Sequence, residues 1–305
     1  MRIVHDHQLN TKQLMPLAII AVEQFFIAAA NGNTVSPTRH NVKTQKGGLT
    51  FTIGAETEFS NSIGFRVYDT YPSGKATNTE QLVAVYSTQT SRLKGLFIGS
   101  KLGAIRTAAI NGLAIKYMSN PTAKIATIIG AGHQAQFQIA ALLAVRRPDL
   151  IYIHNRTPQN AKKLIKFLQK DYDVEFKLSN NLKHSLSKSD IIIYTTSSHQ
   201  PVFKTQWLKP ECYLASIGPK QKNRHELPLD ITQNASLIIS DAPKQLNDYK
   251  QPYFIDDTSP IKPLENIITN PTKPNNSIHL FLSTGRSGTE VIIGNAILSN
   301  SALIL

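Results

Sequence analysis

The chain of 305 residues contains a single cysteine, Cys212. One cysteine excludes an internal disulfide framework and any zinc or iron–sulfur site that needs several cysteines. A lone thiol in a folded protein usually packs as a small buried hydrophobe, so we expect Cys212 to be structural. We predict no metal site.

The chain also lacks acidic residues to balance its basic ones, and it lacks long basic runs. Lys and Arg number 33 against 20 Asp and Glu, a formal net charge of +13, yet no five basic residues stand together. A nucleic-acid-binding domain gathers its charge on one face and adds a reading motif, and no such motif is found. We therefore expect a solvated basic surface that suits anionic ligands, and no nucleic-acid partner.

Long uninterrupted apolar runs are missing as well. The most apolar stretch, residues 14–30, is interrupted by Pro16, Glu23 and Gln24, whereas a membrane span needs about 20 apolar residues. The first residues contain no apolar signal core. These absences predict a cytoplasmic protein with no membrane partner, and the 41% hydrophobic content is that of a folded chain.

Short apolar runs alternate with helical patterns through the middle of the chain, which predicts parallel strands joined by right-handed crossovers. Continuous apolar runs are typical of strands that are buried on both faces. The predicted fold class is α/β, with a doubly wound Rossmann sheet. The expected strands are residues 124–129, 150–154, 174–178, 190–194, 213–217, 236–239 and 278–282, and the expected helices are 135–145 and 158–169.

The two ends of the chain have a mixed pattern. We expect helices at residues 11–30, 102–119 and 288–298 from their apolar spacing, and strands at 49–53, 63–67 and 81–87 from their β-branched alternation. Residues 71–78 and most of 247–276 are rich in polar residues, proline and asparagine, and they predict loops.

A glycine-rich motif follows the first strand of the middle region. Gly130, Gly132 and Ala135 form the pattern G-x-G-x-x-A between a predicted strand and a predicted helix. Gly130 permits a tight turn, Gly132 lets the backbone approach a pyrophosphate, and Ala135 allows close packing of helix and strand. The helix N-terminus then offers N–H groups to the phosphates. The motif predicts dinucleotide binding; a glycine turn of another α/β fold is the alternative.

The end of the second strand bears on which dinucleotide binds. A carboxylate there would bond the ribose 2′-hydroxyl of NAD, but the chain has Asn155, Arg156 and Thr157 instead. Asn155 and Thr157 can donate hydrogen bonds to a phosphate, and Arg156 can pair with its charge. We therefore favour NADP(H), with NAD(H) as the alternative.

Three segments together resemble the ornithine cyclodeaminase/mu-crystallin family: residues 103–112 around Arg106, the glycine motif, and residues 155–157. Residues 217–227 and 281–285 agree with it too. The resemblance implies hydride transfer between a nicotinamide and the α-carbon of a small amino or imino acid. It implies a discontinuous α+β substrate-binding and dimerisation domain, residues 1–119 with 283–305, around a Rossmann domain of residues 120–282. A homodimer is expected.

The resemblance also assigns residues to the site. Arg39 and Arg106 match arginines that hold the substrate carboxylate, a task suited to the bidentate guanidinium fork. Arg66 falls where relatives usually have a lysine that contacts the substrate. The positions that match cofactor contacts are His133, Gln134, Thr196, Ile217, Arg224 and Ser283.

One departure from the family pattern concerns the reaction itself. Cyclodeaminases carry an aspartate after the strand, and here Lys220 takes its place. A lysine cannot replace a carboxylate base in the same step, so we expect an imine reductase or amino-acid dehydrogenase. Its proton donor would be Lys220, His225, Tyr68 or a bound water.

Two other readings stay open. The first is an ornithine cyclodeaminase with a relocated acid, for which Glu56 and Asp69 are candidates. The second is a protein without catalysis that binds NADPH or another small ligand. The first would release ammonia without net use of cofactor, and the second would bind NADPH without turnover.

Overall fold

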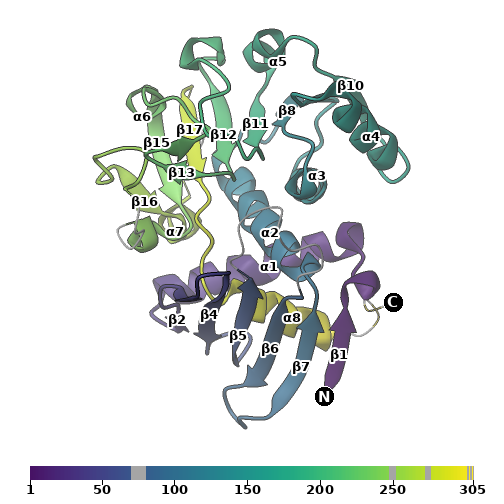
Figure 1. The fold of residues 1–305 in the computed structure, drawn as a ribbon, viewed down its shortest axis with the longest axis vertical. Coiled ribbons are helices and arrows are strands. Elements are labelled where there is room, and N and C mark those ends of the chain that lie inside the picture. Colours follow the sequence, from purple (N-terminus) through teal and green to yellow (C-terminus); the bar gives the residue numbers. More distant parts are fainter. Residues whose placement is uncertain (70–79, 247–251, 272–275, 301, 303, 305) are drawn as a thin grey trace. The chain divides into compact units, whose positions relative to one another are not determined.

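A computed structural model describes residues 1–69, 80–246, 252–271, 276–300, 302 and 304. These residues form two compact units, each of which is visible as a separate sheet with its helices in Figure 1. Unit 1 is Met1–Ala109 with Gly285–Leu305, and unit 2 is Ile110–Thr284. The loop predicted at residues 71–78 lies outside the described residues.

Unit 1 is a largely antiparallel sheet with helices α1 and α8 packed against each other and α8 packed on the sheet. The strand order is β1-β7-β6-β5-β4-β2, with β3 paired to β4, and β1 runs parallel to β7. Its strands are β1 Arg2–His5, β2 Thr34–Val35, β3 His40–Lys43, β4 Gly48–Glu56, β5 Ser62–Asp69, β6 Leu82–Ser87 and β7 Leu93–Ile98. Its helices are α1 Thr11–Ala30, α8 Thr289–Ser299 and the first part of α2 Lys101–Met118.

Strands β4 and β5 carry a different kind of residue on each face of this sheet. Thr52 on β4 and its cross-strand partner Arg66 on β5 are buried on the inner face. Ile53, next to Thr52, and Ile63, further along β5, belong to the opposite face and are exposed. Because side chains alternate along a strand, one face of the sheet is polar at this place and the opposite face is apolar.

Helix α1 is long and apolar enough to cross a membrane by length and composition, contrary to the expectation drawn from its interruptions. Half of the apolar window is buried inside the chain, including Phe25 and Phe26. The helix packs along α8. A buried core helix passes the same test as a span, so its burial explains its composition.

Unit 2 contains a parallel sheet in the order β10-β9-β8-β11-β12-β17-β15-β16. The order reverses direction between β8 and β11, which is the topological switch point where doubly wound sheets bind ligands. The sheet strands are β8 Ile125–Ile129, β9 Leu150–His154, β10 Glu175–Leu178, β11 Ile191–Tyr194, β12 Cys212–Ser216, β15 Ala235–Ser240, β16 Ile261–Pro263 and β17 Ile278–Leu282. The other elements are α3 His133–Val145, α4 Pro158–Leu168, α5 Leu182–Lys188, α6 Ile231–Asn234, α7 Leu264–Thr269 and the hairpin β13 Lys220–Gln221 with β14 Arg224–His225.

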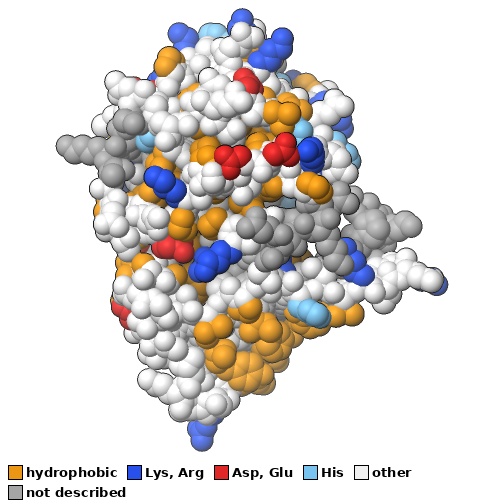
Figure 2. Space-filling view, turned by 90° about the vertical axis from the view of Figure 1, so that its left-hand side faces the viewer, with side chains coloured by type: hydrophobic (Ala, Val, Ile, Leu, Met, Phe, Trp, Pro, Cys, Tyr) orange, Lys and Arg blue, Asp and Glu red, His pale blue; other side chains and the backbone are white. Residues whose placement is uncertain are grey.

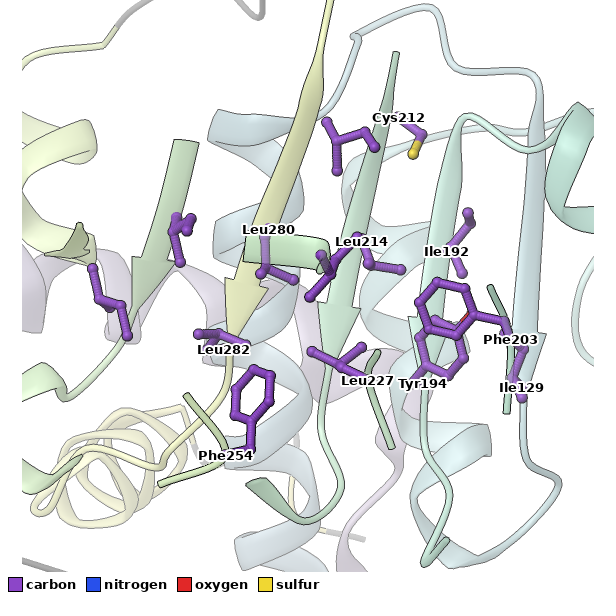
Figure 3. Packing of buried hydrophobic residues seen from close by; sticks show 14 of the residues in the cluster. Ile129, Ile192, Tyr194, Phe203, Cys212, Leu214, Leu227, Phe254, Leu280 and Leu282 are labelled. Atoms are coloured by element: carbon purple, nitrogen blue, oxygen red, sulfur yellow. The ribbon is translucent and has the colours of Figure 1, made fainter. Parts of the chain in front are cut away.

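One hydrophobic cluster on this parallel sheet is shown in Figure 3. Tyr194 at the end of β11 stacks on Phe203 with 4.7 Å between ring centroids. Leu214 and Leu280 come from the adjacent strands β12 and β17. Cys212 belongs to the same cluster. Burial raises the pKa of its thiol to about 12, so the thiol is protonated at neutral pH, as expected of a structural cysteine.

The α/β class with a Rossmann-type parallel sheet is confirmed. The described part of residues 247–276 is mostly loop, as predicted, and it also contains β16 and α7, which were not predicted. Strands β1 and β7 and helix α5 were not predicted at all. These elements are short, and their stability comes from neighbours that are distant in sequence, such as β1 along β7.

Candidate functional site

The glycine turn of unit 2 joins β8 to α3. Gly130 has φ +103°, and a Cβ placed there would lie 2.7 Å from Thr195 Oγ1, so the turn requires glycine on both grounds. A Cβ on Gly132 would meet no atom of the described residues within 4 Å. The backbone of Gly132, at the start of α3, therefore faces open space. A pyrophosphate can approach this face and reach the N–H groups of the helix N-terminus.

Asn155 ties the glycine turn to the end of β9. Its Oδ1 accepts a hydrogen bond from the backbone N–H of Ala131 at 3.0 Å, and its Nδ2 donates to the carbonyl of Thr157 at 2.9 Å. The residue therefore braces the turn from within the protein, a use not foreseen from the sequence. Arg156 and Thr157 are exposed at the end of the same strand.

The remaining residues predicted to contact the cofactor lie at the start of α3, on β14 and in loops of unit 2. His133 is exposed and its ring lies 5.2 Å from that of Phe137. Two of the predicted residues, Gln134 and Arg224, have a buried side-chain atom, Oε1 and Nε respectively, without a hydrogen-bond partner among the described residues. A buried polar atom without a partner is costly. Both atoms are therefore suited to a partner supplied by a bound molecule.

A buried carboxylate, Glu226, organises the loops that follow β11 and β12. Its Oε2 accepts hydrogen bonds from Thr196 Oγ1 at 2.7 Å and from the Thr196 backbone N–H at 3.2 Å. Its Oε1 accepts from Ser216 Oγ and from the Gly218 N–H, both at 2.7 Å. Thr196, one of the predicted cofactor contacts, is thereby held in place. Sequence reasoning used Glu226 only to recognise the family pattern and missed this role.

Ile217 and Ser283 lie directly after neighbouring strands of the parallel sheet. Ile217 donates its N–H to the carbonyl of Tyr194, and Ser283 donates its N–H to the carbonyl of Ser216 at 3.1 Å. The sheet's hydrogen bonding thus continues one residue past its strands. Both predicted residues are therefore at the carboxyl ends of the strands, where ligands of open α/β sheets bind.

Lys220 is buried at the start of β13, and its Nζ donates to the carbonyl of Gly218 at 2.7 Å. Burial lowers the pKa of the Lys220 ammonium to about 8, against the opposing charges of Glu226 and Asp241, which raise it. The group is therefore protonated at neutral pH and able to release its proton slightly above it. That behaviour fits a general acid.

The other groups considered for proton transfer have different surroundings. His225 directs Nδ1 to the carbonyl of Leu227 at 2.7 Å, and Tyr68 lies under the Arg66 guanidinium at 4.5 Å. Glu56 is fully buried, and its carboxylate accepts backbone N–H groups of the loop that follows, including that of Phe59 at 2.7 Å. Glu56 is therefore occupied with holding a loop.

The predicted arginines Arg66 and Arg106 come together in unit 1 at one carboxylate, Glu290, and Arg39 lies beside Arg106 at Gly285. Arg66 Nη1 and Arg106 Nη2 lie 2.8 Å and 2.7 Å from the same oxygen, Glu290 Oε1. Arg39 Nη2 donates to the carbonyl of Gly285 at 3.0 Å. Burial by itself would raise the pKa of Glu290, but Arg106 and Arg66 outweigh it and lower the pKa to about 2.

Glycines make room for these guanidinium groups. A Cβ on Gly103 would lie 2.3 Å from Arg66 Nη2, and one on Gly285 would lie 2.3 Å from Arg39 Nη2 and 2.6 Å from Arg106 Nη1. We call Arg39, Arg66, Arg106 and Glu290 the arginine cluster. Its charges are three positive and one negative, so it attracts an anion.

Sequence reasoning missed Glu290, although a signal was present. It is the only acidic residue after Glu265, and it stands in the first turn of an otherwise apolar helix, α8. A charged side chain in such a helix is rarely left buried without an ionic partner. The identity of that partner depends on residues far away in the sequence.

A parallel sheet with a glycine turn after β8 defines a dinucleotide-binding protein of the Rossmann class. Residues 2–298 match the model of the ornithine cyclodeaminase/mu-crystallin family, and the chain belongs to that family. The resemblance found in the sequence is thereby confirmed.

Similar proteins include reductases of imino acids. A Delta(1)-pyrroline-2-carboxylate reductase of Bacillus cereus is 26% identical over 234 residues, 75% of this chain and 70% of that protein. Ketimine reductase mu-crystallin of Rattus norvegicus is 23% identical over 241 residues, 77% and 75% of the two chains. The structure of Thermococcus litoralis Delta(1)-pyrroline-2-carboxylate reductase in complex with NADH and L-proline has a TM-score of 0.86 at 25% identity and covers 99% of this chain and 98% of that chain.

Proposed function

We propose that this protein is an NAD(P)-dependent oxidoreductase that reduces a small α-imino acid to the amino acid, or catalyses the reverse reaction. The observation that carries the proposal is the arginine cluster, which offers a buried, positively charged place for a carboxylate. The glycine turn at Gly130 and Gly132 supports it from the cofactor side. The relatives named as pyrroline-2-carboxylate and ketimine reductases indicate the class of substrate.

The residues of the glycine turn fit a nicotinamide dinucleotide. The open face of Gly132 and the N-terminus of α3 would hold the pyrophosphate, and Gln134 Oε1 and Arg224 Nε have no protein partner among the described residues. When bound, the nicotinamide supplies or accepts a hydride. Of the two cofactors we propose NADP(H), because the exposed Arg156 at the end of β9 can pair with a 2′-phosphate and no carboxylate stands there.

On the substrate side, Arg66 and Arg106 are the residues that we propose to bind the carboxylate. Both guanidinium groups share one Glu290 oxygen, so two positive charges face a single negative one and a second anion is favoured beside them. Arg39, held at the Gly285 carbonyl, adds a third positive charge. An arginine keeps its charge at every physiological pH, so the clamp binds a carboxylate regardless of pH.

The proton of the reaction is assigned to Lys220. Reduction of a neutral imine takes up one proton at the nitrogen and one hydride at the carbon of the C=N bond. The proton comes first and converts the imine to the iminium, and the hydride then gives the amine. Lys220 is protonated at neutral pH, and its lowered pKa favours release of that proton. The absence of a carboxylate at this position argues against cyclodeamination.

We also propose a homodimer built on the exposed face of the unit 1 sheet. Leu49 and Ile53 on β4 and Ile63 on β5 are 43%, 48% and 42% exposed, although they are large and apolar. Figure 2 shows hydrophobic side chains gathered in a patch on the lower part of the view. An apolar patch on a sheet face marks an interaction surface, and a second copy of this chain offers a matching one.

The experiment is an absorbance assay at 340 nm with NADPH and, separately, NADH. The substrates are Δ1-pyrroline-2-carboxylate, Δ1-piperideine-2-carboxylate, and pyruvate with ammonia, beside an ammonia assay on ornithine and lysine. We expect oxidation of one nucleotide per imine reduced, with NADPH preferred. Ammonia from ornithine without net oxidation would instead establish a cyclodeaminase, and tight NADPH binding without any turnover would establish a binding protein.

The matched variants are Arg106→Ala and Arg147→Ala, which remove a cluster arginine and an exposed arginine of unit 2. Loss of a charge-assisted bidentate contact predicts a fall in kcat/KM of about 100-fold or more for the first variant. Because Arg106 is not part of the glycine turn, NADPH titrated by fluorescence should still bind. Full activity of Arg106→Ala would contradict the carboxylate clamp.

A further inference from the structure

The two oxygens of Glu290 have different surroundings. Oε1 receives both Arg66 and Arg106, at 2.8 Å and 2.7 Å. Oε2 is buried and has no hydrogen-bond partner among the residues that the structure describes. An ionised carboxylate oxygen buried without a partner carries a large desolvation cost, so this oxygen is suited to a donor that a bound ligand supplies.

Other buried polar atoms without a partner occur around the same cluster. Thr52 Oγ1 belongs to the residue directly opposite Arg66 in the pairing of β4 with β5. Arg66 Nε and Ser287 Oγ are also buried and have no hydrogen-bond partner within the described part of the chain. Native proteins leave few such groups unpaired, and their concentration here indicates a place that a polar ligand completes.

The chemistry of an α-imino or α-amino acid matches this arrangement. Its carboxylate and its nitrogen are attached to the same carbon, so a site that holds the carboxylate has the nitrogen close by. The nitrogen is protonated in the iminium or ammonium form and carries N–H donors and a positive charge. Glu290 is ionised because Arg106 and Arg66 lower its pKa, despite the opposing effect of burial. An ionised oxygen beside the arginines is the natural acceptor for that N–H.

We infer that Glu290 is a substrate-binding residue with two tasks, one for each oxygen. Oε1 holds Arg66 and Arg106 in position for the substrate carboxylate, and Oε2 accepts the N–H of the substrate nitrogen. The inference rests on the proposed function and deepens it. It implies that the site selects ligands that carry a protonated nitrogen next to a carboxylate and disfavours those that carry an oxygen there.

Close backbone contact between β4 and α8 places Glu290 at this point. Gly288 has φ +89°, and a Cβ on it would lie 2.7 Å from Gly54 Cα, while a Cβ on Gly54 would lie 2.3 Å from Gly288 Cα. Helix α8 therefore begins directly against the sheet, and its first turn carries Glu290 to the inner face where Arg66 lies. The glycine pair is a structural requirement for the proposed contact.

The test compares ligands that differ only in the nitrogen, measured by calorimetry in the presence of saturating nicotinamide cofactor. One pair is L-proline with (S)-tetrahydrofuran-2-carboxylate, and the other is L-alanine with L-lactate. In Glu290→Gln we expect the affinity of the amino acid to fall about tenfold or more, because a hydrogen bond to a charged group is lost. The oxygen analogue should change much less, since its carboxylate still meets the arginines.

Gln81→Ala is the matched control, because Gln81 accepts a hydrogen bond from Arg66 Nη2 but has no proposed contact with the ligand. Gln81→Ala should lower the affinity for both ligands of a pair by the same factor. Equal losses for both members in Glu290→Gln would overturn the inference and leave Glu290 as a positioning residue only. A wild-type protein that binds neither amino acid and reduces no imine would refute the proposed function itself. Glu290→Asp, which keeps the charge, should recover part of the amino-acid preference if Glu290→Gln folds poorly.

Discussion

Lys220 is the residue on which we base the choice between imine reduction and cyclodeamination. It stands where the cyclodeaminase pattern has an aspartate, and it is buried near Glu226 and Asp241. A buried ammonium is destabilised relative to the neutral amine, which turns an ordinary lysine into an acid that works near neutrality. In the mechanism that we propose, the substitution therefore removes a base and supplies a proton donor.

Replacement of Lys220 by Met tests this assignment. We expect kcat for imine reduction to fall about 100-fold or more, in the usual range for loss of a general acid. In the wild type, kcat should decline above about pH 8 as the ammonium loses its proton, and this decline should be missing in the variant. The measurement is a pH profile of both proteins with the same imine, because the substrate's own protonation then cancels.

Thermal unfolding provides the accompanying control. The folded pKa of Lys220 is lowered from 10.5 to about 8, so between these values the unfolded state binds more protons and stability rises with pH. Below about pH 8, the Lys220→Met protein should therefore have a higher Tm than the wild type. This difference in Tm should disappear as the pH rises toward the unfolded pKa of 10.5. A decline in kcat that persists unchanged in the variant would assign the proton to His225, Tyr68 or water.

The β8–turn–α3 element offers a comparison between two glycines only two residues apart. Within the part of the chain that the structure describes, a Cβ added at Gly132 meets no atom within 4 Å, whereas at Gly130 it meets Thr195 and the backbone has φ +103°. Gly132→Ala should keep the wild-type Tm and weaken NADPH binding about tenfold or more, because the methyl group occupies the approach of the pyrophosphate. Gly130→Ala should lower Tm instead, through strain and overpacking of about 1–3 kcal/mol.

Fluorescence titration of NADPH and thermal unfolding of both variants separate the two effects. Unchanged NADPH affinity in a stable Gly132→Ala protein would show that the turn does not hold the pyrophosphate. The same titration with NADH measures the cofactor preference that we attribute to Arg156.

We propose that unit 1 provides the dimer interface in addition to its arginine cluster. Ile53 lies on the proposed interface and is 48% exposed. Phe167 on α4 of unit 2 is 49% exposed and lies outside that interface, so it serves as the matched control. We expect the wild type and Phe167→Asp to have the mass of two chains by light scattering, and Ile53→Asp to have the mass of one. A charge buried without a partner in an interface is strongly unfavourable. A monomeric wild type would contradict the dimer.

Local patterns predicted much of the fold. All strands of the parallel sheet except β16 were found almost at their observed bounds, most of them because their apolar runs are continuous. The glycine turn was found because its spacing is dictated by backbone geometry. Prediction failed for short elements such as α7 and β1, whose formation depends on packing against distant segments.

By itself, the sequence determined the Rossmann-type sheet, the position of the glycine turn and the family. These properties reside in the order of neighbouring residues, and apolar periodicity and glycine spacing report them directly. Only the tertiary structure brought Arg66 to Glu290, which is 224 residues further along the chain, and buried Lys220 near Glu226 and Asp241. Coulomb interactions and desolvation depend on distance and exposure in space, and a linear order of residues does not contain them.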